Sequence, residues 1–370
     1  MRLKHGLMAA IVILGLGAPA ALESFRFAAY AQAPAESRTQ TVNDLATKLE
    51  AHYYDPAVGK KYAAMLRANA AAGNYDSIID NKAFAKQVTD DIQAVAFDGH
   101  LKLVAKAKAA PTGGQAAAEP DGIPKAIEAA ERLTKDIAYI RLGRFFGEPE
   151  NVAAIRKFLI DNQDAKTLIL DVRTHIGGGL DEMNAMFPLL FDKETILVGM
   201  DTRAGVGSPL EDGPRLRRVA APANVVRREH FVVPAAGPRP LAKAKVFVLA
   251  SGRTGSAGEH FVLSLKRTHR ATVIGETTYG AGNFGDNEQI AGGFSAFIPV
   301  GRTFDPDTNK GWDYVGIAPN VAVPAAEALI EALVRSGVPK AEAQALSAKY
   351  GPSADEVSSL RKAPASVPGI

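Results

Sequence analysis

"LASGRTGSAGEHF" (residues 249–261) joins two predicted elements of different kinds. The apolar run KVFVLA ends inside it, a Gly/Arg/Thr/Gly turn follows, and Ser256 stands at the start of a predicted helix over 256–266. A hydroxyl at the positive end of a helix suits a nucleophile, because the helix favours a developing alkoxide. Serine is also an ordinary helix cap, but this interpretation leaves Gly255 and Gly258 unexplained. Both interpretations stay open at this point.

A second strand-to-helix junction lies upstream, in "LILDVRTHIGGGL" (residues 168–180). The near-continuous apolar run predicts a strand buried on both faces, and a helix is expected over 179–190. N–H groups exposed at a glycine turn bind an anion or an oxyanion, although a tight turn alone would also use glycine. The spacing is neither G-x-G-x-x-G nor followed by Gly-Lys-Ser/Thr, so the dinucleotide fingerprint and the P-loop are excluded.

The same alternation continues around these two junctions. Strands are predicted in DIAYIRLGRF, ATVIG and FSAFIPV, and helices over 148–159 and 325–336. Strands that alternate with helices favour one α/β core, which we place at residues 123–336. A further helical piece is expected in the tail, residues 337–370.

The region before this core has a helical pattern. Apolar residues recur at helical spacing, Thr41 with Asp44 resembles a capping box, and breaks at 73–74 and 80–81 divide the region into three helices. We therefore expect an N-terminal helical domain over 41–104. The Ala/Pro/Gly-rich residues 105–122 are expected to be a linker.

The N-terminus resembles an export signal. Arg2 and Lys4 precede an apolar run, and Ala29 and Ala31 are the small residues that a signal peptidase reads. We expect residues 1–31 to be a signal peptide, with an uncleaved membrane anchor as the alternative. The glycine- and proline-interrupted run is shorter than the roughly 20 residues that a span needs. A periplasmic or secreted protein without a stable membrane span is therefore expected.

Composition excludes several classes. A formal charge of +3 over 370 residues gives no general electrostatic reason to bind nucleic acid. One basic stretch, 215–228, is expected to be a solvated loop rather than a polyanion site. The chain contains no cysteine, which excludes catalytic thiols, thiolate metal sites and disulfides.

An activated serine needs a base, and seven histidines are candidates. His100 leaves a Gly-His turn in FDGHLKL, from which its side chain could project into a cleft. Asp313, in GWDYVGIAPNVAVP, is either an acid that orients a histidine or a turn residue.

Together these stretches resemble the tail-specific (C-terminal processing) serine peptidase family over most of residues 41–335. LILDVRTHIGGG is similar to its Asp-x-Arg-x-Asn-x-Gly-Gly segment, with His175 at the Asn position. SGRTGSAGEHF is similar to its nucleophile segment, in which Ser256 is followed by Glu259. ATVIGETTYGAGN is similar to its Gly-Glu-Thr-Thr segment and contains Glu276.

Two departures point to one branch of the family. The tail-specific proteases proper carry a Gly-Lys-Gly triplet whose lysine is the general base of a Ser–Lys dyad, and Ala281 takes the place of that lysine here. Too few residues separate His100 from the first core strand to form the family's PDZ domain. The chain is instead similar to the branch that contains the tricorn protease core and the interphotoreceptor retinoid-binding protein repeats. Residues 98–100 (Asp-Gly-His) match its Asp-x-His segment, and WDYVGIAP matches Trp-Glu-x-x-Gly-Val-x-Pro, with Asp313 in place of Glu.

The resemblance implies a crotonase/ClpP-like α/β core of ββα units, an N-terminal three-helix domain and no PDZ domain. It implies Ser256 as nucleophile, His100 as base and Asp313 as the acid that orients or polarises the site. His175, which occupies the family's Asn position, is expected either to compete as a base or to plug the pocket.

For the oxyanion hole, the resemblance implies the N–H groups of Gly177 or Gly178 together with that of Ala257. Glu259 and Glu276 are expected to support the site.

These expectations describe an exported serine peptidase that forms an acyl-enzyme and needs no metal or other cofactor. Its substrate would be a peptide or an unfolded protein; whether it forms a homo-oligomer is left open. The alternative is a non-catalytic binding protein for apolar ligands or peptides on the same fold. A crotonase-type acyl-CoA enzyme is disfavoured, because export removes it from coenzyme A.

Overall fold

The computed structural model describes residues 35–106 and 125–361, which belong to one compact unit. The predicted signal peptide 1–31, nearly all of the predicted linker 105–122 and the last residues of the tail, 362–370, lie outside the described residues. The limits of the helical domain and of the linker stay predictions.

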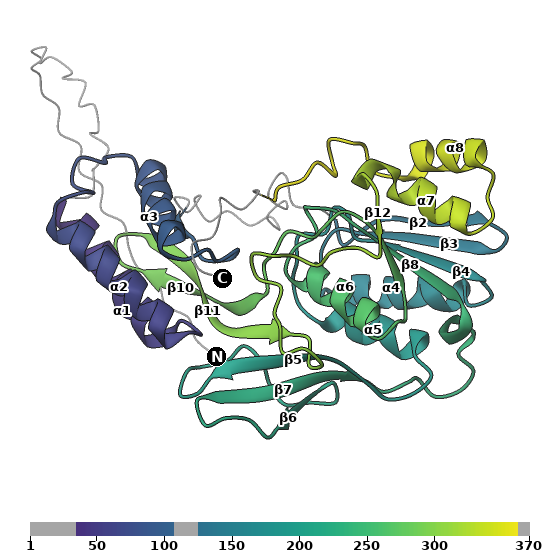
Figure 1. The fold of residues 1–370 in the computed structure, drawn as a ribbon, viewed down its shortest axis with the longest axis horizontal. Helices are drawn as coiled ribbons and strands as arrows, with labels where there is room; N and C mark the ends of the chain where they lie inside the picture. The colour runs from purple at the N-terminus through teal and green to yellow at the C-terminus, as the bar shows by residue number, and fades with distance from the viewer. Residues whose placement is uncertain (1–34, 107–124, 362–370) are drawn as a thin grey trace, which may run out of the picture. The chain divides into compact units, whose positions relative to one another are not determined.

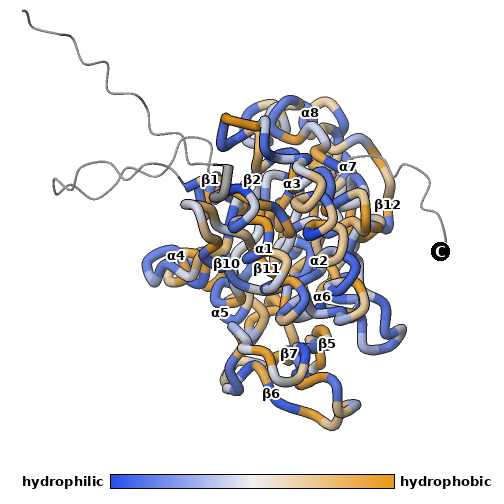
Figure 2. Tube along the Cα trace, turned by 90° about the vertical axis from the view of Figure 1, so that its left-hand side faces the viewer, coloured by the Kyte–Doolittle hydropathy of each residue, from blue (hydrophilic) through white to orange (hydrophobic). Residues whose placement is uncertain are grey.

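Three helices open the described chain, as predicted: α1 Ala35–His52, α2 Pro56–Ala71 and α3 Asn81–Val95. Asp55 caps α2, where its Oδ1 accepts a hydrogen bond of 2.9 Å from the N–H of Ala57. Asp80 caps α3 in the same way. Hydrophobic and hydrophilic stretches alternate along the chain of these helices, as amphipathic elements require (Figure 2).

The predicted capping box of Thr41 and Asp44 is wrong, because α1 begins earlier and both residues lie inside it. Their side chains instead hold the turn at Ala291. The Thr41 hydroxyl donates to the Ala291 carbonyl (2.9 Å), and Asp44 Oδ2 accepts from the Ala291 N–H (2.9 Å).

The helices pack on an antiparallel sheet. Its strands run in the order β1-β11-β5-β7-β6, with β10 on β11: β1 Leu103–Ala105, β11 Phe294–Phe304, β5 Thr195–Arg203, β7 Val225–Val232, β6 Leu216–Val219 and β10 Asn283–Ile290. Leu45, Leu49 and Phe84 from the helices share one buried core with Phe294 and Ile298 of this sheet. The N-terminal helices are thereby fixed to a strand more than 200 residues further along the chain.

The second sheet is mostly parallel and has the order β12-β9-β8-β4-β3-β2: β12 Val321–Ala322, β9 Thr272–Gly275, β8 Lys245–Ala250, β4 Thr167–Asp171, β3 Ile137–Leu142 and β2 Ile127–Thr134. Every residue of β4 is buried, as its apolar run predicted.

Helices cover both faces of this second sheet (Figure 1). One face carries α4 Pro149–Asp161, α5 Asp181–Leu190 and α6 Ala257–Arg267; the other carries α7 Ala328–Arg335 and α8 Lys340–Tyr350. Short 3-10 helices stand at Pro240–Lys243 and Ala325–Glu327. The predicted α/β class with N-terminal helices is confirmed.

The expectation of a loop over 215–228 is wrong, since this stretch contains β6 and the start of β7 in an antiparallel pair. Its arginines are neutralised locally: Arg217 pairs with Glu194 and Glu229, and Arg227 pairs with Asp201. The basic run therefore belongs to a sheet edge with its own carboxylates.

Within residues 35–106 and 125–361, none of the helices combines the length and the apolarity that crossing a membrane requires.

Candidate active site

The turn before α6 is bonded to the turn after β4. The Thr254 hydroxyl donates to the carbonyl of Val172 (2.8 Å), and the Gly255 N–H donates to the carbonyl of His175 (3.0 Å). β4 and β8 are neighbours in parallel, so both turns leave the same edge of the sheet. The two sequence stretches that carried the prediction therefore meet in space.

Ser256 has a strained backbone. Its φ of 53° and ψ of −118° lie in a region that favours glycine, whereas the ordinary cap Asp55 has φ −100° and ψ 106°. Such strain persists where the surrounding structure over-determines it, commonly at functional sites. A sharp strand-to-helix turn of this kind exposes the nucleophile of α/β hydrolases. Ser256 thus has the position of a helix cap but not the backbone geometry of an ordinary one.

The glycine turn lies directly against Ser256. Gly177 has a φ of 122°, and a Cβ at this position would lie 2.8 Å from the Cβ of Ser256. The Gly177 N–H donates to Nδ1 of His175 (3.1 Å). Among the described residues, by contrast, the N–H groups of Gly178 and Ala257 have no acceptor. These two are the donors available to an oxyanion.

The carboxylate of Glu259 joins three parts of the site. It accepts from the N–H groups of Ser256 (2.9 Å), Gly280 (2.7 Å) and Ala281 (2.8 Å), and from the hydroxyl of Thr278 (2.6 Å). Burial raises the pKa of Glu259 to about 7, and the four donors oppose that shift because they stabilise the ionised form. The residue fixes the Ser256 turn relative to the loop that carries Ala281.

His100 is held differently. Its backbone N–H donates to Oδ1 of Asp98 (2.9 Å), and its ring stacks on Phe297 with centroids 5.0 Å apart. Nδ1 of the ring is buried and has no hydrogen-bond partner in the described part of the chain. Burial lowers the pKa of His100, and the nearby Lys102 adds to this effect, while Asp98 opposes it. The imidazole is therefore neutral at neutral pH, as a general base must be.

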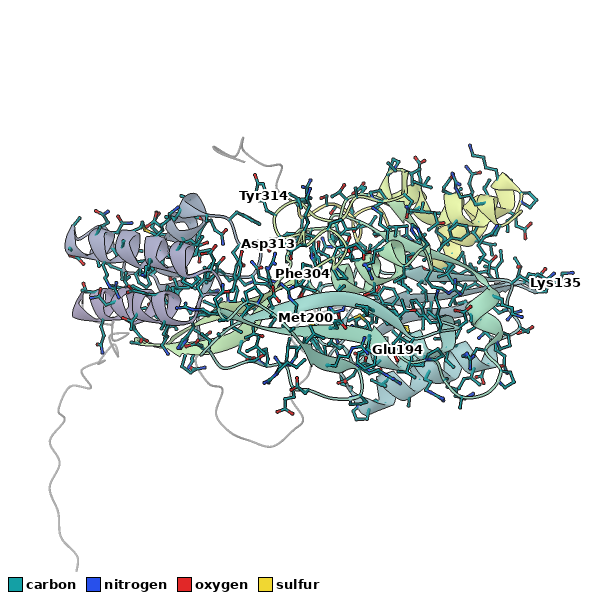
Figure 3. All side chains as sticks on the ribbon, turned by 60° about the horizontal axis from the view of Figure 1, so that its bottom comes forward. Lys135, Glu194, Met200, Phe304, Asp313 and Tyr314 are labelled. Atoms are coloured by element: carbon teal, nitrogen blue, oxygen red, sulfur yellow. The ribbon has the colours of Figure 1, made fainter. Side chains whose placement is uncertain are left out.

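Asp313 bridges the two sides through backbone contacts. It lies beside Tyr314 on the segment between β11 and β12 (Figure 3). Its Oδ1 accepts from the Gly282 N–H (2.9 Å), and the Gly99 N–H also donates to its carboxylate. Burial, and next the charge of Asp98, raise the pKa of Asp313 well above its usual range. Asp313 thus contacts the turn that carries His100 through its backbone, at Gly99.

One cleft of about 570 Å³ gathers several of the predicted residues. His100, Ser256, Ala257, Gly178 and Ala281 all line it. The remaining predicted residues, Gly177, Asp313, Glu259 and Glu276, are not part of the lining.

Two further residues complete the picture. Glu276 accepts the N–H of Ala325 (3.0 Å), which ties the end of β9 to the first turn before α7. His175 is fully buried and outside the cleft lining; burial lowers the pKa of its ring to about 3.

Sequence reasoning gave no role to His260, which also lines the cleft. A signal was present, because His260 follows Ser256 by four residues on a predicted helix, and positions i and i+4 share one helical face. The described residues contain no group of three His, Asp or Glu side chains arranged to hold a metal ion.

Comparison with known proteins finds relatives in sequence and in fold. Residues 136–323, just over half of the chain, match the model of peptidase family S41. Residues 35–140 match the N-terminal domain of these peptidases in eukaryotic IRBP. In solved structures, a protein from Parabacteroides merdae covers 84% of this chain and 96% of its own, with a TM-score of 0.53 at 16% identity. A lipoprotein from Streptococcus agalactiae covers 82% and 97%, with a TM-score of 0.52 at 14% identity.

Two curated relatives are more similar in sequence over shorter stretches. A carboxyl-terminal-processing protease of Picosynechococcus is 26% identical over 203 residues, 52% of this chain and 41% of the relative. Carboxyl-terminal-processing peptidase 3 of Arabidopsis thaliana, a chloroplastic protein, is 28% identical over 166 residues, 44% of this chain and 27% of the relative. The matching region thus spans less than half the length of either relative. By its family match, the chain belongs to peptidase family S41, a family of serine-type peptidases.

Proposed function

We propose that this protein hydrolyses peptide bonds with Ser256 as the nucleophile and His100 as the general base. The observation that carries the proposal is that a serine in a strained strand-to-helix turn shares one cleft with a neutral imidazole. The substrate would be a peptide or an unfolded protein segment.

The reaction would run through an acyl-enzyme. His100 takes the hydroxyl proton of Ser256 as Oγ attacks the scissile carbonyl, and it later gives a proton to the leaving amine. The N–H groups of Gly178 and Ala257 are available to stabilise the tetrahedral oxyanion. Water then attacks the acyl-enzyme and releases the second product.

This proposal differs from a Ser–Lys mechanism at one position. Ala281 lines the cleft and carries no amine, so the proton must go to another group. Among the described residues of the lining, the basic side chains are His100 and His260. His260 is hydrogen-bonded to His230 through Nε2, and the similarity of residues 98–100 to the Asp-x-His segment is what favours His100 as the base.

The proposal extends to location. The charged start, apolar run and small residues of 1–31 support export to a periplasmic or extracellular space. N-terminal sequencing of the mature protein should begin after Ala31; a mature protein that still starts at Met1 would contradict this part.

Cleavage of a disordered protein tests the chemistry. Wild type should cleave it, and Ser256→Ala should lose roughly 10⁴-fold or more of the rate. Ser264→Ala is the matched control, because Ser264 lies on the same helix, is fully buried and has an Oγ without a partner in the described residues. Cleavage by Ser256→Ala at the wild-type rate would contradict the proposal. If wild type cleaves nothing but binds apolar ligands, the binding-protein alternative is correct.

A further inference from the structure

The ionisable residues that line the cleft are unevenly distributed. Two carboxylates, Asp181 and Glu211, are part of the lining, and no described Lys or Arg is. Neither carboxylate forms an ion pair with another described residue. The whole chain carries a net charge of +3, so the negative cleft is a local feature. An uncompensated negative charge in a cleft raises the local concentration of cationic partners.

A third acceptor lies in the same cleft. His260 is only 3% exposed, yet it lines the cavity one helical turn beyond Ser256. Its Nε2 is 2.8 Å from Nδ1 of His230, and Nε2 of His230 is 3.0 Å from Oδ1 of Asn184. The amide oxygen of Asn184 can only accept, so Nε2 of His230 carries its hydrogen and Nδ1 of His230 accepts.

This chain of hydrogen bonds fixes the tautomer of His260. Its hydrogen must be on Nε2, which leaves a lone pair on Nδ1. Nδ1 has no partner among the described residues. Burial lowers the pKa of His260 to about 3, and it also lowers that of His230, so both rings are neutral. A fixed acceptor without a protein donor, on a ring that is only 3% exposed, is suited to receive a hydrogen bond from a ligand.

We propose that this wall of the cleft selects a substrate side chain that carries positive charge and N–H donors, namely arginine or lysine. Nδ1 of His260 accepts a hydrogen bond from the side chain, and Asp181 and Glu211 supply the complementary charge. The same wall disfavours a substrate carboxylate, whether on a side chain or at a chain end. This inference rests on the proposed function, because it assigns the substrate class of that cleft.

Binding to the Ser256→Ala protein tests the inference without turnover. The probes are labelled peptides that are identical except at one position, which holds arginine, citrulline, leucine or glutamate. The variable position is moved along the peptide from one set of probes to the next. Citrulline keeps the N–H donors of arginine but lacks its charge. Arginine should bind tightest and glutamate weakest, with Kd values about tenfold apart for two exposed charge pairs. Equal affinities, or tighter binding of glutamate, would overturn the proposal.

Variants separate the two contributions. Asp181→Asn with Glu211→Gln should remove the preference for arginine over citrulline, as should 1 M salt, because exposed charges are screened. His260→Phe should remove the preference for citrulline over leucine, which salt leaves intact. Asp212→Asn is the control: this carboxylate is on the same loop as Glu211 but outside the cleft lining, and it pairs with Arg228. If both preferences survive the cleft variants, the assignment is wrong.

The outcome is independent of catalysis. If the wild-type protein cleaves no peptide, the proposed function is wrong, but the ranking of peptide affinities can still be measured. A ranking without the arginine preference, in a protein that cleaves peptides, would remove only the present inference.

Discussion

The Ser256 side and the His100 side of the cleft are held in place by different means. Backbone hydrogen bonds at 172–175 and the carboxylate of Glu259 fix the Ser256 turn. The imidazole of His100 has stacking on Phe297 and no partner for its buried Nδ1 in the described part of the chain. Asp313 contacts the backbone on both sides, at Gly282 and Gly99.

This difference has a consequence for catalysis. Hydrogen bonds have a direction and fix an orientation, whereas stacking permits small rotations. The Ser256 turn is therefore preorganised, whereas the orientation of the His100 ring depends on packing at the junction of the N-terminal helices with β11. Changes on the His100 side should alter proton transfer, and changes on the Ser256 side should alter the geometry of attack.

The largest expected effect comes from replacing His100, the proposed base. His100→Gln keeps a polar side chain of similar length but cannot take a proton, so kcat should fall roughly 10⁴-fold. Steady-state cleavage of a peptide measures this loss. His269→Gln, at a histidine outside the cleft lining, is the control and should keep full activity. An unchanged kcat in His100→Gln would show that another group is the base.

The next effect tests the Ser256 side. Gly177→Ala places a Cβ 2.8 Å from that of Ser256 at a φ of 122°, so kcat should fall roughly 10²-fold as the attack geometry shifts. Gly205→Ala controls for backbone strain alone, because Gly205 has a φ of 80° and nothing within 4 Å of an added Cβ. If both variants lose the same activity, close contact with Ser256 is not the cause.

A smaller effect concerns Glu259 and pH. Its carboxyl has a pKa of about 7 in the folded protein. In a plot of kcat/KM against pH, the change near pH 7 should therefore report ionisation of Glu259 rather than of His100, whose pKa is lowered. Thr278→Val removes a donor to the ionised form, which raises the pKa and moves the limb to higher pH by about one unit. Thr278→Ser keeps the hydroxyl and should leave the limb in place.

The same shift predicts the direction of a stability change. Since the pKa is raised above the unfolded value of about 4.3, the folded state binds the proton more tightly. The stabilisation is complete below that value and is lost as the pH rises towards about 7, by at most about 1.4 kcal/mol per pH unit. Denaturant unfolding at several pH values measures it, and stability that rises over this range because of Glu259 would contradict the assignment.

The smallest effect is expected away from the cleft. Glu276→Gln keeps an oxygen that accepts the Ala325 N–H, so activity should stay within about twofold of wild type and stability within about 0.5 kcal/mol. A large loss of activity at unchanged stability would assign Glu276 a direct part in the site, although it is not part of the cleft lining.

The sequence predicted the parts of the fold that depend on local pattern. The β8–turn–α6 unit is contiguous, and its apolar run, glycines and helical spacing are all visible in the chain. The three N-terminal helices were predicted for the same reason. The strand β10, with the polar sequence NFGDNEQI, carries no apolar alternation and was missed. It exists because β11 supplies its backbone partners.

The candidate site was also predictable only where it depends on local sequence pattern. Ser256 and the glycine turn follow strands that are neighbours in one sheet, so their meeting could be expected. Glu259 could be chosen as a supporting residue, but not its four donors, because three of them come from a loop about 20 residues later in the chain. The contact between His230 and His260 depends on α6 packing against the antiparallel sheet, which the sequence did not predict.

The most direct test of the account is labelling with a fluorophosphonate, which reacts with activated serines. Intact-mass and peptide analysis should find one adduct in wild type, on the peptide that contains Ser256. Ser256→Ala should not be labelled, and His100→Gln should be labelled far more slowly. A wild-type protein that stays unlabelled, or an adduct that persists in Ser256→Ala, would contradict the claim that this cleft activates Ser256.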